Sequence, residues 1–208
     1  MWWFSVLLCG VVSCASHTKH DQNESTQLAA AVSAGHAQAV FAGGCFWCME
    51  APFDETDGVI STTSGYTGGD ELQPSYAEVA AGQTGHVEAI RVVYDPTIIS
   101  YSELVNLFWH NIDPLQDDGQ FCDRGSQYRS AIFTSDENEI QVAKESKLAI
   151  ATQLNATVVT EIRPAAAFWV AEAYHQNYYR VQPQRYAQYR IGCGRDNRLM
   201  VLWGQTGH

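Results

Sequence analysis

Two cysteines beside a pair of glycines are the residues with the clearest capacity for chemistry. Cys45 follows Gly43-Gly44 and opens a segment, residues 45–53, that has the pattern of a helix start. Backbone N–H groups at a helix N-terminus carry partial positive charge, which stabilises the thiolate, the reactive form of cysteine. Glycine at this turn lets the backbone approach a ligand closely. We therefore expect Cys45 to be a nucleophile with a lowered pKa.

The same short segment also fits other interpretations. The C-x-x-C spacing of Cys45 and Cys48 predicts a thioredoxin-like thiol–disulfide oxidoreductase. Phe46 and Trp47 would form an apolar cup for a small group such as a methyl, which also suits a non-catalytic protein that binds oxidised or methionine-rich partners. A zinc site needs four ligands, and no second C-x-x-C or H-x-x-x-H stands at a suitable spacing, so we expect no metal.

The remaining cysteines divide into two groups. Cys9 and Cys14 lie in an apolar N-terminal run, whereas Cys122 and Cys193 lie in the main part of the chain with Cys45 and Cys48. In an exported protein these four could form two structural disulfides. Cys193 has a glycine on each side, and this composition gives its sulfur freedom to move.

The elements that must hold these residues follow from periodicity and breakers. Strands are expected over residues 36–41, 59–65, 87–94, 128–133 and 157–162. Helices are expected over 45–53, 74–81, 100–109, 136–154, 168–179 and 183–189, with a loop over 113–126 and an irregular tail over 190–204. Strands that alternate with helices indicate an α/β domain.

The N-terminal residues are expected to be a targeting segment. An apolar run over residues 2–12 is too short to span a bilayer and has the pattern of a secretory signal. It ends in Val11-Val12-Ser13-Cys14, which resembles the lipobox of bacterial lipoproteins, although no Lys or Arg precedes it. An ordinary signal peptide cut near Ala15, or an uncleaved anchor, is the alternative.

These features predict the organisation of the whole chain. Residues 1–14 are the signal and lipobox, residues 15–35 a polar tether, and residues 36–204 the domain. Cys14 would carry the lipid, and the protein would be an exported, membrane-anchored lipoprotein that faces the periplasm or the cell exterior.

Composition narrows the class of protein further. The chain has 208 residues, of which 46% are hydrophobic and 17% charged, which suits one folded domain and excludes a disordered chain. Lys plus Arg is 12 against 23 for Asp plus Glu, and the net charge of −11 leaves no basic footprint for nucleic acid. We expect a monomer.

Seven segments, in order along the domain, then carry a resemblance. They are AGGCFW (42–47), GYTGG (65–69), PSY (74–76), GHVEA (85–89), GQFCDRGSQYRS (119–130), AEAYHQ (171–176) and CGR (193–195). Each segment alone is modest, but the ordered set is similar to the peptide methionine sulfoxide reductase A family. The match runs from about residue 38 to residue 204.

The resemblance implies a reaction and a role for each matching residue. Methionine-S-sulfoxide, protein-bound or free, would be reduced to methionine in the repair of oxidised proteins. Cys45 would be the nucleophile that becomes a sulfenic acid, and Glu88, buried and with a raised pKa, the acid that protonates the sulfoxide oxygen. Tyr76 and Tyr128 would donate hydrogen bonds to that oxygen. Phe46 and Trp47 would form a pocket for the substrate methyl, and Asp123 would belong to the polar wall of the pocket.

The resemblance also implies how the enzyme is recycled. A second thiol would convert the sulfenic acid to a disulfide, which an external thioredoxin-like dithiol would reduce, with no bound cofactor. Family members place a recycling cysteine in the tail, which points to Cys193; Cys48 and Cys122 are alternatives, and so is a permanent disulfide at Cys193. Glu50 is expected on the helix surface or as a structural partner, and His175 is expected to be a packing histidine.

The fold implied by the family is a two-layer α/β sandwich. It is a ferredoxin-like βαβ plait followed by a long irregular C-terminal segment that wraps it. The predicted order of strands and helices is compatible with this fold but does not establish it.

Overall fold

The structure, a computed structural model, describes residues 34–204. The predicted signal, the lipobox with Cys14 and nearly all of the tether lie outside the described residues. Among the described helices, none combines the length and the apolar composition that crossing a membrane requires.

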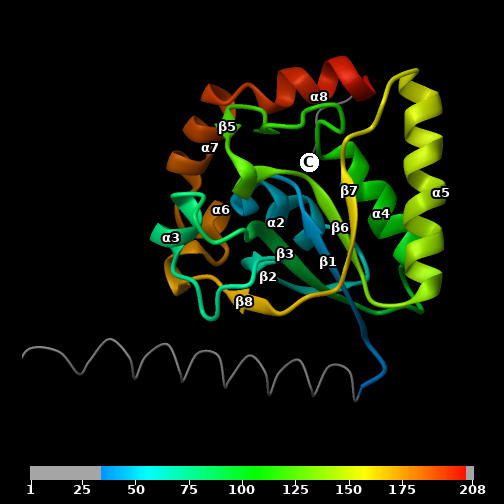
Figure 1. The fold of residues 1–208 in the computed structure, drawn as a ribbon, viewed down its shortest axis with the longest axis horizontal. Coiled ribbons are helices and arrows are strands. Elements are labelled where there is room, and N and C mark those ends of the chain that lie inside the picture. Colours follow the sequence, from blue (N-terminus) through cyan, green and yellow to red (C-terminus); the bar gives the residue numbers. More distant parts are fainter. Residues whose placement is uncertain (1–33, 205–208) are drawn as a thin grey trace, which may run out of the picture.

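A six-stranded sheet forms the centre of the molecule (Figure 1). Its strands stand in the order β7-β6-β1-β3-β2-β8, and every neighbouring pair is antiparallel except β6 with β7. The strands are β1 (Ala37–Ala42), β2 (Val59–Thr67), β3 (Val87–Tyr94), β6 (Ala131–Thr134), β7 (Glu161–Pro164) and β8 (Phe168–Val170). The mixed α/β class expected from the sequence is confirmed.

The helices complete a second layer and a C-terminal cover. They are α2 (Phe46–Asp54), α3 (Tyr76–Ala80), α4 (Tyr101–His110), α5 (Glu137–Leu154), α6 (Tyr178–Val181), α7 (Pro183–Gly192) and α8 (Arg195–Trp203). The connection β1-α2-β2 is a split βαβ unit, because β3 pairs with both strands and lies between them. Apart from the short helix α3 between β2 and β3 and the segment β4-β5-η1 before β6, the order from β1 to β6 is βαββαβ, with β7 and β8 added at the two edges of the sheet.

The main core lies between the sheet and the helices α2, α4 and α5. The ring of Phe41 on β1 stacks against Phe53 of α2 at 5.4 Å and against Phe108 of α4 at 5.3 Å. Ile90 and Val92 of β3 belong to the same core. Side chains alternate across a strand, so Glu88 points to the same face as these two residues. The register therefore directs one carboxyl into the helix-covered side of the sheet.

The expected loop over 113–126 carries a small second sheet. Strands β4 (Gly119–Gln120) and β5 (Asp123–Arg124) form a two-residue ribbon, and the 3-10 helix η1 (Ser126–Tyr128) follows it. The expected strand over 128–133 accordingly begins later, at Ala131. The ribbon and η1 together place Cys122, Asp123 and Tyr128 on one short stretch of the chain.

The prediction that residues 168–179 form a helix is wrong. The segment begins as β8, which pairs with β2, and continues as the 3-10 helix η2 (Ala173–His175) before α6. Gly65 of β2 permits this close pairing, because a Cβ there would lie 2.4 Å from the Trp169 carbonyl oxygen. Pairing with β2 at the edge of the sheet makes residues 168–170 a strand, and the local pattern of aromatic residues does not show that this partner is present.

The tail is helical for most of its length and not irregular as expected. Pro183 opens α7, a position where its missing N–H costs nothing, and α8 follows after Cys193-Gly194. In Figure 1 the orange-red helices α7 and α8 run along one side and over the top of the fold. The predicted strand over 157–162 is also displaced, since β7 begins at Glu161.

One buried arginine fastens the tail to the start of α2. Arg195 is 1% exposed, and its guanidinium donates to the carbonyl oxygens of Gly43, at 3.2 Å, and Asn111, at 2.6 Å. The same nitrogen lies 3.1 Å from Met49 Sδ, and the group sits 4.3 Å from the centre of the Phe121 ring. A side chain at the start of α8 thus holds together the glycine turn and the β4–β5 region.

Replacing Arg195 by Met should lower the free energy of unfolding by about 2–3 kcal/mol, because two buried carbonyls lose their donor. Urea denaturation of the full chain measures this change. Arg124→Met is the matched control, since Arg124 makes an exposed ion pair with Asp118 that is worth at most about 1 kcal/mol. Equal stability of the two variants would contradict the role of Arg195.

Candidate active site

Cys45 occupies the N-cap position of α2, at the end of a turn that only glycine permits. Gly44 has φ +81°, and a Cβ on it would lie 2.5 Å from Gln120 Cβ. A Cβ on Gly43 would lie 2.5 Å from Met49 Sδ. The two glycines therefore let the chain pass between α2 and the β4–β5 ribbon, which brings the Cys45 sulfur into a buried position.

The expected lowering of the Cys45 pKa is wrong. Burial raises the pKa of the Cys45 thiol well above its ordinary value, and Cys48, Glu88 and Asp123 raise it further. Cys45 donates a hydrogen bond to the sulfur of Cys48, which lowers the pKa of Cys48 to about 7 with the help of the Arg195 charge. Desolvation outweighs the helix N-terminus here, because the site is closed and acidic groups surround the sulfur.

The N–H at the start of α2 is taken by a carboxyl. Phe46 N donates to Glu88 Oε2 at 3.2 Å, and Glu88 is 2% exposed. Burial raises the pKa of Glu88 to about 8; the Phe46 hydrogen bond opposes the shift, whereas Asp123 and Cys48 add to it. Glu88 therefore carries a proton at neutral pH, next to the residue that follows Cys45.

Two phenols complete this polar centre. Tyr76 begins α3 and Tyr128 ends η1, and both side chains are half-buried. Burial, followed by the nearby Glu88, raises the pKa of Tyr76 to about 12 and raises that of Tyr128 as well. Both phenols also interact electrostatically with Cys45. The structure thus brings together four side chains predicted from four separate segments.

The position of Tyr76 is fixed by an acidic residue that sequence analysis did not single out. Glu172 accepts a hydrogen bond from the backbone N–H of Tyr76 at 2.9 Å and one from the Tyr66 hydroxyl at 2.9 Å. It thereby links α3 to β2 across the site. Its place in the AEAYHQ segment is the only sequence signal that marks it.

Aromatic rings form the wall beside the sulfur. The Trp47 ring stacks on Tyr178 at 3.8 Å, and its Nε1 donates to His175 Nδ1 at 3.1 Å. The His175 ring lies 5.0 Å from Phe46 and 4.4 Å from Tyr76. Burial lowers the pKa of His175 to about 4, so it is neutral and can accept the Trp47 bond. His175 is therefore structural, as expected, but it orients a residue of the predicted pocket.

Asp123 connects this wall to the tail. It accepts a short hydrogen bond from the Tyr189 hydroxyl of α7, and the Tyr189 ring meets Trp47 edge-on at 5.8 Å. Burial raises the pKa of Asp123. The sequence predicted helices that end at Tyr179 and Tyr189 but assigned neither Tyr178 nor Tyr189 to the site, because both lie outside the seven segments that carry the family resemblance.

Two of the four cysteines in the domain are bonded to each other. Cys122 and Cys193 form a disulfide, whereas Cys45 and Cys48 are free and buried. Asp123 interacts with both pairs: its charge acts on Cys45, and its Oδ2 is 4.0 Å from Cys193 Sγ. The bond shows that Cys193 can pair, and that the partner it has here is Cys122 and not Cys45.

Two further groups bear on the predictions. Glu50, expected as a surface or structural residue, is fully buried, and burial raises its pKa to about 7. Within residues 34–204, Cys122, Asp123 and Cys193 are the single cluster with the spacing of a metal site, their ligand atoms lying within 4.8 Å of one another. The two sulfurs in that cluster are bonded to each other and offer no thiolate.

The arrangement supplies the parts that reduction of a polar S=O group needs. A buried thiol, a neutral carboxylic acid and two phenols lie close enough to interact electrostatically, and the acid and the phenols can each donate a hydrogen bond. The apolar rings of Phe46 and Trp47 border the same sulfur on its own helix. The second pair of cysteines, Cys122 and Cys193, lies beside Asp123.

Comparison with known proteins gives the family. The family model described as "Peptide methionine sulfoxide reductase" matches residues 37–206. The chain is 50% identical over 167 residues to a peptide methionine sulfoxide reductase MsrA of Ligilactobacillus salivarius, which covers 79% of this chain and 96% of the relative. These matches span the whole described domain.

Solved structures agree with the sequence comparison. The reduced form of Mxr1 from Saccharomyces cerevisiae is 30% identical, with a TM-score of 0.69 over 72% of this chain and 87% of that one. A structure of Mxr1 in complex with Trx2 has the same fold, with 21% identity, a TM-score of 0.50, and coverage of 69% and 84%. The chain belongs to the peptide methionine sulfoxide reductase family and is an oxidoreductase enzyme.

Proposed function

We propose that this protein reduces methionine-S-sulfoxide, in proteins or as the free amino acid, through a sulfenic acid on Cys45. The observation that carries the proposal is the buried Cys45 thiol beside the protonated Glu88, whose pKa of about 8 suits an acid at neutral pH. Phe46 and Trp47 would receive the substrate methyl. Tyr76 and Tyr128 would donate to the sulfoxide oxygen.

The chemical step conserves protons within the site. The Cys45 sulfur attacks the sulfoxide sulfur while Glu88 gives its proton to the oxygen, which joins the two sulfurs in a sulfurane. The hydroxyl then moves from the substrate sulfur to the Cys45 sulfur as the bond between the sulfurs breaks, so methionine leaves and Cys45 is a sulfenic acid. The thiol proton of Cys45 replaces the one that Glu88 gave. The Phe46 N–H, which already bonds to Glu88, stabilises the carboxylate while it is charged.

The oxidised enzyme would then be resolved by Cys193. Its thiol attacks the sulfenic acid, water leaves, and a Cys45–Cys193 disulfide forms. Gly192 and Gly194 flank Cys193, and a Cβ on either would meet no described atom within 4 Å, so the segment between α7 and α8 has room to move. A thioredoxin-like dithiol is the proposed reductant, a role that the Mxr1–Trx2 complex supports by analogy.

We also propose that residues 1–14 export the protein and that Cys14 anchors it as a lipoprotein. The apolar run and the lipobox-like ending support this, and all the side chains of the proposed site come from one chain, so a monomer suffices. Mass spectrometry of the mature protein should find a lipidated Cys14 at the N-terminus. A mature N-terminus at any other residue would contradict anchoring at Cys14.

Cys45→Ser should abolish methionine sulfoxide reduction, because serine cannot form the sulfenic acid. The measurement is methionine released in one turnover by the pre-reduced full chain, without added reductant. Cys48→Ser is the matched control, since Cys48 is buried one turn further along α2; its first turnover should remain. Loss of the first turnover in Cys48→Ser would favour a C-x-x-C oxidoreductase instead.

Glu88→Gln should slow the chemical step by at least about 100-fold, because an amide cannot give up a proton to the oxygen. The wild-type single-turnover rate should be constant below the Glu88 pKa of about 8 and fall as the pH rises through it, since only the protonated acid acts. Rapid-quench measurement of methionine across this range tests both statements.

Glu103→Gln is the control for this change, because Glu103 is an exposed carboxyl in the N-terminal cap of α4, where glutamine serves equally well. Its rate and pH profile should match those of the wild type. A Glu88→Gln variant that keeps the wild-type rate would show that another group supplies the proton.

A further inference from the structure

The Cys122–Cys193 disulfide lies at a different depth from the reacting sulfur. Cys45 and Cys48 are buried, Cys193 is half-buried, and Cys122 is exposed on the loop of the β4–β5 ribbon. An external protein therefore reaches the four sulfurs unequally. Attack on a disulfide requires the incoming thiolate to approach the sulfur in line with the S–S bond, so access decides which sulfur is attacked.

The two sulfurs of the disulfide also differ as leaving groups. The backbone N–H of Cys122 donates to Cys193 Sγ at 3.2 Å. A thiolate that develops on Cys193 keeps this donor, and a thiol that leaves with its charge stabilised leaves faster. Cys193 is thus the better leaving group, and Cys122 is the sulfur open to attack.

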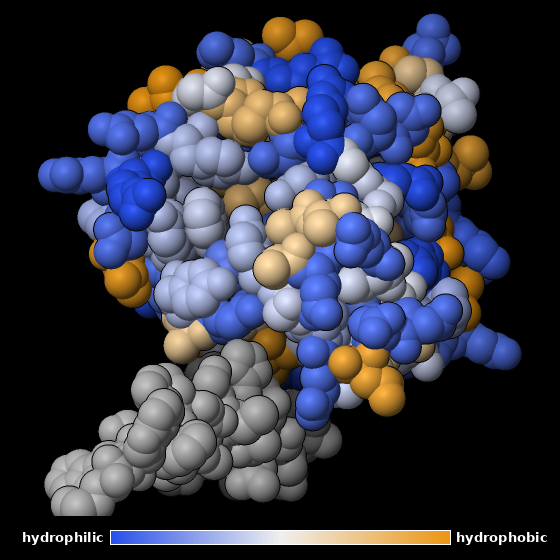
Figure 2. Space-filling view, turned by 60° about the vertical axis from the view of Figure 1, so that its left-hand side comes forward, coloured by the Kyte–Doolittle hydropathy of each residue, from blue (hydrophilic) through white to orange (hydrophobic). Residues whose placement is uncertain are grey.

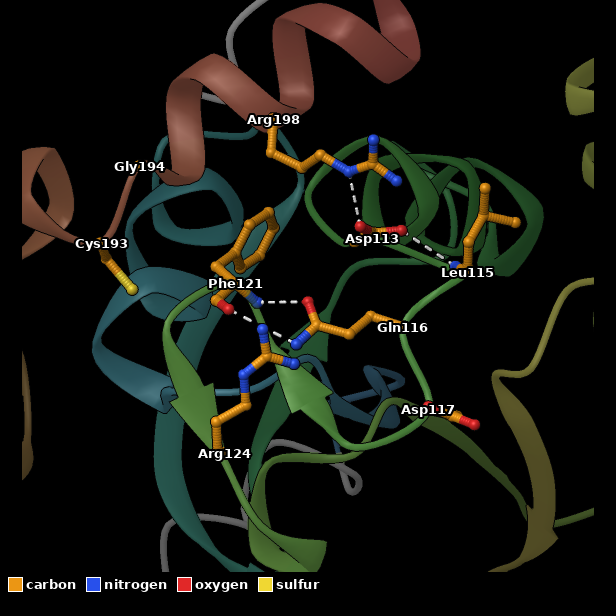
Figure 3. A pocket seen from close by; sticks show the side chains of 9 residues that line it. All are labelled: Asp113, Leu115, Gln116, Asp117, Phe121, Arg124, Cys193, Gly194 and Arg198. Carbon is orange, nitrogen blue, oxygen red and sulfur yellow. Dashed lines mark hydrogen bonds and ion pairs between the residues drawn. The ribbon is translucent and has the colours of Figure 1, made fainter.

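Open space adjoins the leaving side. A cavity of about 510 Å³ is lined in part by Phe121, Cys193 and Gly194, and by Arg124 and Arg198 from opposite sides (Figure 3). In Figure 3 Cys193 and Gly194 lie at the edge of this cavity, just before the start of α8. A released Cys193 can therefore move without displacing a packed side chain.

We propose that Cys122 is the residue through which the external dithiol delivers its electrons, and that Cys193 then carries them to Cys45. The proposal rests on the function proposed above and adds a further catalytic residue to it. The juxtaposition that carries it is the pairing of an exposed Cys122 with a half-buried Cys193, beside the Asp123 carboxyl whose charge also acts on the reacting Cys45.

Each exchange in this path balances. Cys122 thiolate attacks Cys193 in the Cys45–Cys193 disulfide, which forms the observed Cys122–Cys193 bond and releases Cys45 as a thiolate. A thiolate of the external dithiol then attacks Cys122 and releases Cys193. The second thiol of the reductant then attacks the first sulfur of the reductant, which is bonded to Cys122. Cys122 is released as a thiol, and the reductant leaves as a disulfide.

The direct test traps the mixed disulfide. The probe is a thioredoxin whose second active-site cysteine is replaced by serine, so that it cannot complete the exchange. It is added to the full-chain Cys48→Ser protein after reaction with one equivalent of methionine sulfoxide. Peptide mapping by mass spectrometry should place the thioredoxin on Cys122; a bond to Cys193 or Cys45 would overturn the proposal.

A second test counts turnovers and does not require thioredoxin to bind the protein. Without reductant, pre-reduced Cys48→Ser protein should release about two equivalents of methionine, because Cys45 is freed once by Cys122. Cys48→Ser/Cys122→Ser protein should release about one. Measuring methionine and not thiols keeps Cys9 and Cys14 out of the count. Equal yields from the two proteins would overturn the relay.

Steady-state rates separate this proposal from the function on which it rests. Cys122→Ser should keep the first turnover at the wild-type rate but lose at least about tenfold of its thioredoxin-supported rate, because the reductant must reach a more buried disulfide. An unchanged thioredoxin-supported rate would contradict the role of Cys122 but not the proposed function. Loss of the first turnover in Cys122→Ser, or activity retained in Cys45→Ser, would defeat the proposed function itself.

Discussion

The hydrogen bond from the Phe46 N–H to Glu88 joins helix α2 to strand β3 at the active site. It fixes the start of α2 to β3, so the cysteine that precedes Phe46 and the acid on the sheet share one buried volume. The bond is possible because the register of β3 turns Glu88 toward the helices and because Gly43-Gly44 lets the chain turn tightly above it. Every other group of the site is arranged around this pair.

Burial keeps the two reacting groups of the site protonated. Removing water raises the pKa of both Cys45 and Glu88, so each keeps its proton at neutral pH. A site with a neutral thiol and a neutral acid carries little charge to desolvate before substrate enters. The helix N-terminus would favour a thiolate in water, but the Phe46 N–H is occupied by Glu88, and burial of Cys45 opposes a negative charge on its sulfur.

The C-terminal helices give the site its outer wall and carry Cys193, one sulfur of the disulfide. Figure 2, turned to bring the side with α3, α6 and α7 forward, shows hydrophobic residues scattered among hydrophilic ones. Tyr178 and Tyr189 of these helices meet Trp47, and Tyr189 holds Asp123. Arg195 fastens the following helix to the glycine turn. The proposed path of electrons therefore passes through Cys193, in the same tail that closes the pocket.

The sequence by itself determined the strong local elements and the candidate residues. The strand at Val87–Tyr94 and the helix at Glu137–Leu154 follow from alternation, periodicity and end signals, and the ordered motifs pointed to Cys45, Glu88, Tyr76 and Tyr128. Only tertiary structure decided the direction of the Cys45 pKa shift, the strand at Phe168–Val170, and the pairing of Cys193 with Cys122. The physical reason is common to all three: desolvation, edge pairing and sulfur contact depend on residues that are distant along the chain and become neighbours only when it folds.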